Sequence, residues 1–213
     1  GLGDVYKRQD NIVGATSGLE VDIDSGKIVG YSGTDNVVVI PQYLPVDNGD
    51  GSTTVVKVTG IESGAFAGKD IAGIRLSDNI TEIPENAFKN CDELEIIEAN
   101  SIEKIGNNAF SGCTVLKEYN VSSSVKELGK NAFAGVKKVT VKASDGAVAK
   151  AAVTSGAKNI ILDISKTGEQ LYNTKLEIPS GTEVFELNGG VKDYINLRVV
   201  SDCLLYTSDA ADD

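Results

Sequence analysis

Apolar residues recur through the middle of the chain with a period of about 22 positions. Four Ala-Phe pairs mark this period, and their phenylalanines are spaced by 22, 22 and 23 residues: Phe66, Phe88, Phe110 and Phe133. An Ile or Leu stands five positions before each phenylalanine, and three apolar residues, spaced by three and then two positions, follow it. One such unit holds too few apolar groups to close a core of its own. The period therefore predicts a solenoid, in which equivalent side chains of successive units stack.

Each unit is expected to supply two short strands and a tight helical turn. Residues 94–99 read Leu-Glu-Ile-Ile-Glu-Ala, which predicts one strand per unit, and stacked strands form a parallel sheet with a spacing of roughly 4.8 Å. Residues 102–110 supply the second strand and the turn on the opposite side. We expect the four phenylalanines to form a buried ladder, with Cys91 and Cys113 each three positions after a phenylalanine and also inside.

Other elements are expected at the two ends of the repeat. Residues 19–40 alternate on both sides of a turn at 24–26, which predicts an N-terminal β-hairpin. Residues 45–54 are rich in Asp, Gly and Ser and predict a surface loop. Residues 144–155 predict a short helix and residues 160–162 an edge strand, and together these would cover the last unit as a C-terminal cap.

The two termini read as translated sequencing adapters. Residues 4–9 match the in-frame translation of a transposon mosaic end, and residues 203–208 match that of its reverse complement. We therefore expect the chain to be a fragment of a larger protein whose terminal residues pack against nothing. The expected parts are adapter-derived residues 1–9, a β-hairpin unit at 10–40, the repeat solenoid at 41–141, the cap at 142–164, the start of a further β-rich unit at 165–202, and adapter-derived residues 203–213.

Composition excludes several classes of protein. The 213 residues carry 31 Asp and Glu against 20 Lys and Arg, a net charge of −11, which disfavours a nucleic-acid binder. The longest aliphatic run is Val37–Ile40, far short of the ~18 apolar residues that a membrane span needs. The chain has no histidine, which removes Ser-His-Asp and Cys-His catalysis and the common zinc sites.

The remaining candidate chemistry has structural explanations. Cys91 and Cys113 could form a disulfide or half of a metal site, but buried thiols are favoured because no further ligand has zinc spacing. The acidic turn at residues 47–51 lacks the alternation and the terminal Glu of a calcium-binding EF-hand. Glycosylation sequons begin at Asn79 and Asn120, and motifs this short arise by chance. No carboxylate pair is marked as a hydrolase site, so we expect no enzyme, no metal and no cofactor.

The repeat unit resembles that of the BspA-like surface leucine-rich repeat proteins of bacteria and protists, which reads approximately I-P-x-S-V-x-x-I-G-x-x-A-F-x-x-C-x-x-L-x-x-I. The third unit matches it at Ile102, Ile105, Gly106, Ala109, Phe110, Cys113 and Leu116. The resemblance covers about residues 19–162, with Pro84 in place of the glycine and with Lys69 and Val136 in place of the cysteine. It implies a β-rich α/β leucine-rich-repeat stack of short parallel strands and short helical turns.

The resemblance also implies a function: a non-enzymatic binding or adhesion module of a secreted or cell-surface bacterial protein. We expect a protein or cell-surface ligand, no nucleic-acid partner and a monomeric chain. If Ile97 and Ala99 point inward, their neighbours on the strand point outward. The outward positions of the four units supply the candidate binding residues: Arg75, Ile96, Glu98, Glu118, Asn120 and Lys138. The alternatives are a structural spacer that presents a neighbouring domain, or an accessory segment of a large carbohydrate-active enzyme.

Overall fold

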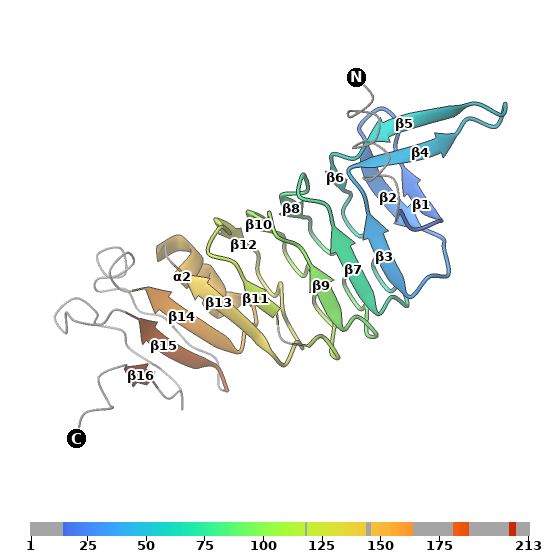
Figure 1. The fold of residues 1–213 in the computed structure, drawn as a ribbon. Coiled ribbons are helices and arrows are strands. Elements are labelled where there is room, and N and C mark those ends of the chain that lie inside the picture. The colour runs from blue at the N-terminus through green and yellow to red at the C-terminus, as the bar shows by residue number, and fades with distance from the viewer. Residues whose placement is uncertain (1–14, 118, 144–145, 164–180, 188–204, 208–213) are drawn as a thin grey trace.

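The computed structural model describes residues 15–117, 119–143, 146–163, 181–187 and 205–207. These residues form short strands in five sheets and one helix. The sheets follow one another from the N-terminal end to the C-terminal end, so that the molecule is elongated along the direction in which the repeats stack (Figure 1).

The N-terminal unit begins with a β-hairpin. Strands β1 (Leu19–Val21) and β2 (Lys27–Tyr31) pair antiparallel, as residues 19–40 predicted. The turn between them is closed by Asp22, whose Oδ1 accepts hydrogen bonds from both the backbone N–H and the hydroxyl of Ser25 at 2.7 Å. Strand β2 then pairs in parallel with β6 (Gly60–Ile61), which joins this hairpin to the repeats.

A second hairpin occupies the segment that was predicted to be a surface loop. Strands β4 (Tyr43–Asp47) and β5 (Thr53–Lys57) pair antiparallel over five positions, so the prediction of a loop at residues 45–54 is wrong. The Asp, Gly and Ser residues that suggested a loop belong to the turn, in which Gly49 and Gly51 have positive φ angles of 80° and 85°. Leu44 and Val56, opposite one another on the two strands, are both buried, and Leu44 packs into the hydrophobic core of the body.

The longer strands of the repeats form two parallel sheets along one side (Figure 1). The first contains β3 (Val37–Ile40), β7 (Gly73–Leu76) and β9 (Ile96–Glu98). The second contains β11 (Tyr119–Val121), β13 (Val139–Ala143), β14 (Asn159–Asp163), β15 (Glu183–Leu187) and β16 (Leu205–Thr207). The parallel pairing predicted for successive units is confirmed by these registers.

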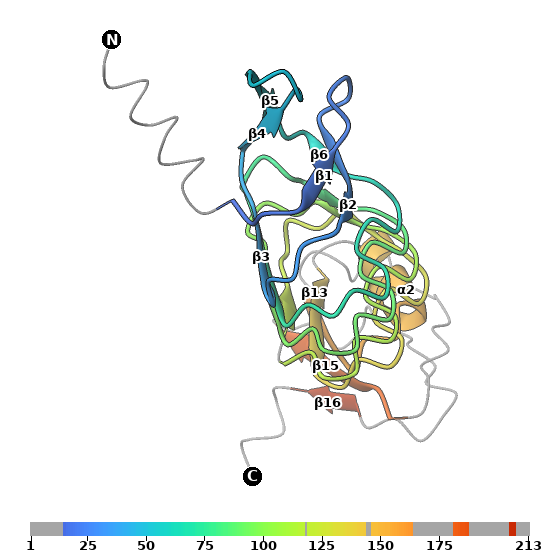
Figure 2. The same cartoon turned by 90° about the vertical axis from the view of Figure 1, so that its right-hand side faces the viewer.

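A row of two-residue strands forms the second strand of each unit. It contains β8 (Glu82–Ile83), β10 (Lys104–Ile105) and β12 (Glu127–Leu128), all parallel. Beyond each of them the chain enters the Ala-Phe turn, and these turns are joined by backbone hydrogen bonds such as Phe88 N–H to Ala109 O at 2.8 Å. The view along the stack shows the turns superposed on the side away from β3 (Figure 2).

Two positions in every turn have left-handed backbone conformation. The position two before each phenylalanine has φ between 53° and 70°: Gly64, Asn86, Asn108 and Asn131. The position two after it has φ between 59° and 86°: Gly68, Asn90, Gly112 and Gly135. Only Gly, and next to it Asn, adopts this conformation at small cost. The backbone conformation therefore accounts for the asparagines before the Ala-Phe pairs.

The phenylalanine ladder, defined as Phe66, Phe88, Phe110 and Phe133, runs through the core with its rings fully buried. Successive ring centroids are 5.4, 5.3 and 5.7 Å apart, and the planes of neighbouring rings are tilted by 22° or less. Tyr31 extends the row at the N-terminal end, at 6.2 Å from the ring of Phe66. It thus takes the place of the phenylalanine in the first unit, which the insertion of the β4–β5 hairpin lengthens.

The C-terminal part begins with helix α2 (Gly146–Thr154), inside the range predicted for a helix. Its buried face includes Val148, Ala149 and Ala152, and Gly156, with φ of 83°, follows its end. Residues 160–162 lie in strand β14 (Asn159–Asp163), as predicted, but β14 is not an edge strand, because it lies between β13 and β15.

The sheet continues into the C-terminal residues that were expected to pack against nothing. Strand β16 pairs with β15, with Phe185 opposite Tyr206 in the register. An unpaired strand edge accepts any extended segment that reaches it, and Leu-Tyr-Thr is a favourable strand sequence. Residues 1–9, and apart from β15 nearly all of residues 165–202, lie outside the described residues.

Candidate binding surface

On the outward face of the first long-strand sheet, two exposed aliphatic side chains lie on either side of a buried glycine. The register places Val37 of β3 opposite Gly73 of β7, and Gly73 opposite Ile96 of β9. The side chains of Val37 and Ile96 are 59% and 49% exposed. Gly73 itself is buried, and a Cβ atom on it would lie 3.6 Å from Val37 Cγ2, so the glycine lets the two aliphatic side chains lie close to it. We call Val37, Gly73 and Ile96 the apolar row.

An ion pair borders the apolar row on the same face. Two positions further along the strands, Arg75 lies opposite Glu98, and its Nε donates a hydrogen bond to Glu98 Oε2 at 2.5 Å. This hydrogen bond and the attraction between the charges raise the pKa of Arg75 and lower the pKa of Glu98. Both side chains are more than half exposed, so the pair adds little stability. The ion pair instead fixes the positions of two charged side chains, which form a polar border beside the apolar row.

The predicted binding residues are divided between two sheets. Arg75, Ile96 and Glu98 lie together on the first, as described above. Asn120, on β11, and Lys138, just before β13, are exposed beside the second sheet. Strands β9 and β11 belong to different sheets, and the backbone bond from Lys117 N–H to Glu95 O, at 3.0 Å, joins their units. Glu118 lies outside the described residues.

Sequence reasoning missed Val37 as a member of this face. Residues 37–40 fall within the segment predicted to form an N-terminal β-hairpin, but β3 pairs with β7 of the repeats. The burial of β3 alternates from exposed Val37 to buried Val38 and from half-buried Val39 to buried Ile40. Comparison of this segment with β7, position by position, would have found it.

The row of short strands presents charge instead of apolar side chains. Lys104 lies between Glu82 and Glu127, with its Nζ 3.4 Å from a carboxylate oxygen of each. The hydrogen bond to Glu82 and the charges of both carboxylates raise the pKa of Lys104. Opposite charges that alternate along the row form ion pairs with one another. This side of the molecule is therefore less suited to an apolar contact than the face of β3, β7 and β9.

The cysteines lie in the core, beside the phenylalanine ladder. Both are free and fully buried, and the thiols of Cys91 and Cys113 donate hydrogen bonds to the carbonyl oxygens of Phe66 and Phe88 at 2.9 and 3.1 Å. Burial raises their pKa values to about 11 and about 12, so both thiols stay protonated at neutral pH. Each thiol therefore ties one repeat to the one before it.

The described part of the chain shows neither a cluster for metal binding nor a membrane segment. Within the described residues, no three or more Cys, Asp or Glu side chains come together in a way that could hold a metal ion. No helix there is long and apolar enough to cross a membrane.

Comparisons with known proteins identify the repeat. Residues 52–148 match the family model described as a BspA type leucine-rich repeat region, in six copies. The fold is similar to the pneumococcal vaccine antigen PcpA, with a TM-score of 0.60 at 18% identity over 90% of this chain and 47% of that one, so this chain spans about half of its length. No match to a curated protein was found.

Two further crystal structures show weaker likeness. A leucine-rich repeat protein from Bacteroides capillosus ATCC 29799 gives a TM-score of 0.48 at 23% identity, over 60% of this chain and 96% of that one. A leucine rich cell surface protein from Faecalibacterium prausnitzii A2-165 gives 0.43 at 19% identity, over 91% and 54%. Repeat phase, parallel strand registers and the family match agree, and the predicted resemblance is confirmed: residues 52–148 form a leucine-rich repeat region of the BspA type.

Proposed function

We propose that this protein is a non-enzymatic protein-binding module that mediates adhesion through the outward face of β3, β7 and β9. The observation that carries the proposal is the apolar row, because it places two exposed aliphatic side chains on either side of a glycine, in adjacent strands. Single exposed apolar residues are ordinary, whereas a contiguous apolar patch with a polar border is typical of interaction sites.

The apolar row has the composition of the centre of an interface. Full burial of an aliphatic side chain contributes roughly 1.5–3 kcal/mol, so contact with Val37 and Ile96 together can supply a substantial part of a binding free energy. Arg75 and Glu98 supply the polar rim, with hydrogen-bonding capacity at the edge of the contact.

We propose further that the module acts outside the cell, as part of a longer secreted or surface-attached bacterial protein. The match to the BspA type supports this location, since the resemblance implies surface exposure. The expected ligand is a protein on the host cell, in its extracellular matrix or on another microbe. The expectations of a monomer and of no nucleic-acid partner belong to the same proposal.

Binding to a panel of immobilised matrix proteins, including collagen, fibronectin and fibrinogen, tests this function. The test variant replaces both exposed aliphatics, Val37→Thr with Ile96→Thr. The matched control is Val115→Thr, since Val115 is also exposed, at 47%, but lies outside β3, β7 and β9. We expect at least tenfold weaker binding for the double variant, about 1.4 kcal/mol, with unchanged binding for the control and unchanged melting temperatures for both. Equal binding of the double variant and wild type, or no binding to any matrix protein, host cell or microbe, would contradict the proposal.

A further inference from the structure

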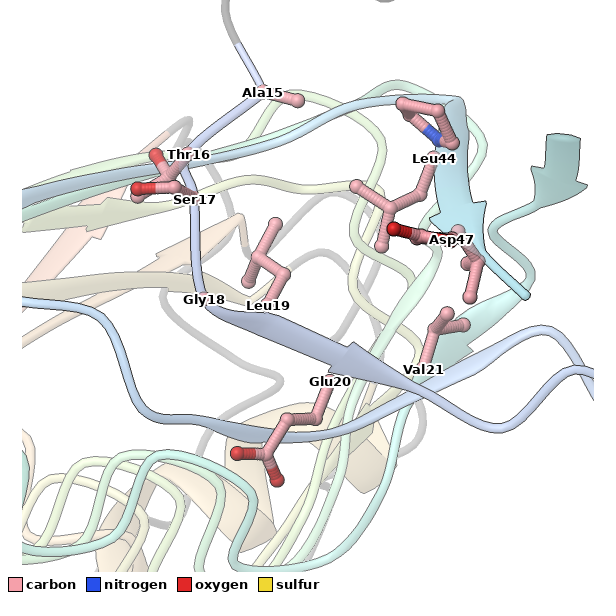
Figure 3. A pocket seen from close by; sticks show the side chains of 11 residues that line it. Ala15, Thr16, Ser17, Gly18, Leu19, Glu20, Val21, Leu44 and Asp47 are labelled. Carbon is pink, nitrogen blue, oxygen red and sulfur yellow. The ribbon is translucent and has the colours of Figure 1, made fainter. Parts of the chain in front are cut away.

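A second surface, at the N-terminal end of the stack, has a different character. A groove of about 490 Å³ is bordered on one side by residues 15–21, which include β1, and on the other by residues 44–47 of β4. Figure 3 shows Leu19 and Val21 pointing toward the side of the groove formed by Leu44 and Asp47. The groove lies beside β3, because the N–H of Thr16, one of its lining residues, donates a hydrogen bond to Val39 O at 3.3 Å.

The edge of β1 that faces away from β2 has unused backbone hydrogen-bonding groups. Gly18 O accepts from Ser32 N–H, and Asp22 N–H donates to Lys27 O, both at 2.9 Å. Backbone groups alternate between the two edges of an antiparallel strand, so Leu19 and Val21 present theirs to the opposite edge. Among the described residues, no backbone partner bonds to the N–H or C=O groups on that edge.

The corresponding edge of β4 is blocked. Val58 N–H bonds to Gln42 O and Asn48 N–H to Ser52 O, at 2.9 and 3.0 Å, so the positions of β4 that face away from β5 include Pro45. Proline has no N–H and interrupts a strand ladder, a common protection of exposed edges. The two walls of the groove are therefore unequal: β1 supplies backbone donors and acceptors, and β4 supplies side chains.

The side chains of the groove define what can lie in it. Leu19, Val21 and Val46 are half-buried and Leu44 is buried, which makes the walls apolar. The charged residues that line the groove, Glu20 and Asp47, are both acidic. Asp22, next in the chain after β1, stays ionised because the hydrogen bonds from Ser25 lower its pKa.

We propose that this groove binds an extended segment of a partner protein, which adds a strand to the free edge of β1. The segment would carry small apolar side chains at alternate positions, to contact Leu19, Val21 and Val46, and Lys or Arg at its ends, to meet the acidic surroundings. In this mode of recognition the backbone bonds supply affinity and the alternate side chains supply specificity. A three-residue edge such as β1 is open only at its two outward positions, so the contact is short and the apolar wall matters.

The probe is a fluorescent peptide, Lys-Val-Thr-Val-Thr-Val-Lys, added to the full chain. We expect hydrogen exchange at the amides of Leu19 and Val21 to be fast without the peptide and to slow at least tenfold with it. Val21→Pro removes an outward N–H without removing a bond between β1 and β2, and should weaken peptide binding at least tenfold. Val21→Ala keeps the N–H and is the matched control, with a smaller loss from the missing methyl groups.

Three results would overturn the proposal. Slow exchange at Leu19 and Val21 in the free chain at every concentration would mean that the edge is already paired, and slow exchange that appears only at high protein concentration would mean that a second copy of the chain occupies it. Equal binding by the proline and alanine variants would remove the role of the backbone. If Val21→Pro does not fold, a peptide N-methylated at alternate residues replaces it, and its binding to wild-type protein as tightly as the parent would have the same meaning.

Discussion

At the scale of single residues, the repeat is defined by backbone conformation as much as by apolar side chains. Each Ala-Phe turn needs left-handed φ angles on both sides of its phenylalanine, and the chain meets this need with Gly or Asn. The sequence pattern showed these asparagines as repeated, but not why, because a φ angle is set by how the turn closes in three dimensions. The Cys residues were interpreted from the pattern alone as buried small side chains, which is how they lie.

Substitution at one turn separates backbone from side-chain effects. Asn108 has a φ of 53°. Asn108→Ala should lower the free energy of unfolding by about 1–2 kcal/mol, because alanine has the full steric cost of the left-handed conformation. Asn108→Gly should be neutral or stabilising. Urea denaturation measures both, with Thr114→Ala, at an exposed position, as the control. Equal stability of the Ala and Gly variants would show that φ does not select Asn here.

The thiols give a prediction about pH. Their pKa values are raised from 9.0, so deprotonation in the unfolded chain occurs at lower pH than in the folded one. The contribution of this difference to the free energy of unfolding is therefore fully present below about pH 8.5. It is lost as the pH rises toward 11. At pH 8 we expect neither thiol to react with a disulfide reagent in native protein and both to react in denaturant. Fast reaction of native Cys91 or Cys113, or a disulfide between them, would contradict the assignment.

At the scale of elements, the recurring unit was predictable and its interruptions were not. Strand order and the buried phenylalanine ladder follow from the period, because every unit has the same apolar positions. The inserted β4–β5 hairpin makes the first unit hard to recognise in the sequence, and Tyr31 takes the place of phenylalanine in that unit. Strand β14 pairs with β15, and β15 pairs with β16. These segments are unlike in sequence, so no local pattern predicts that they pair.

The ladder should carry a large share of the stability of the stack. Phe110 is fully buried. Its ring centroid lies 5.3, 5.7 and 5.8 Å from the ring centroids of Phe88, Phe133 and Tyr119. Phe110→Ala removes a ring from the middle of a continuous core and should cost about 3–5 kcal/mol in chemical denaturation. The control Asp92→Ala, at an exposed position, should stay within roughly 0.5 kcal/mol. Similar losses in both variants would mean that the repeat phase is misassigned.

At the scale of the whole molecule, stability and recognition are on different sides of the same strands. Inward positions such as Ile74 build the core, while outward positions beside them, such as Arg75, are exposed. A combined change of Ile96, Glu98, Glu118 and Asn120 should therefore leave the melting temperature nearly unchanged. The outward direction of Ile96 and Glu98 could be predicted from alternation, whereas the apolar row needed the register of three strands, which brings in Val37.

The most direct test of the account is a hydrogen-exchange footprint of the bound ligand on the full chain. The ligand is the protein, cell or microbe for which binding depends on Val37 and Ile96, as measured with the variants described above. We predict that binding slows exchange in β3, β7 and β9 and leaves the Ala-Phe turns unchanged, because the apolar row is central to the contact. A footprint confined to the turns, to the charged row of Glu82, Lys104 and Glu127, or to the C-terminal sheet would contradict the account.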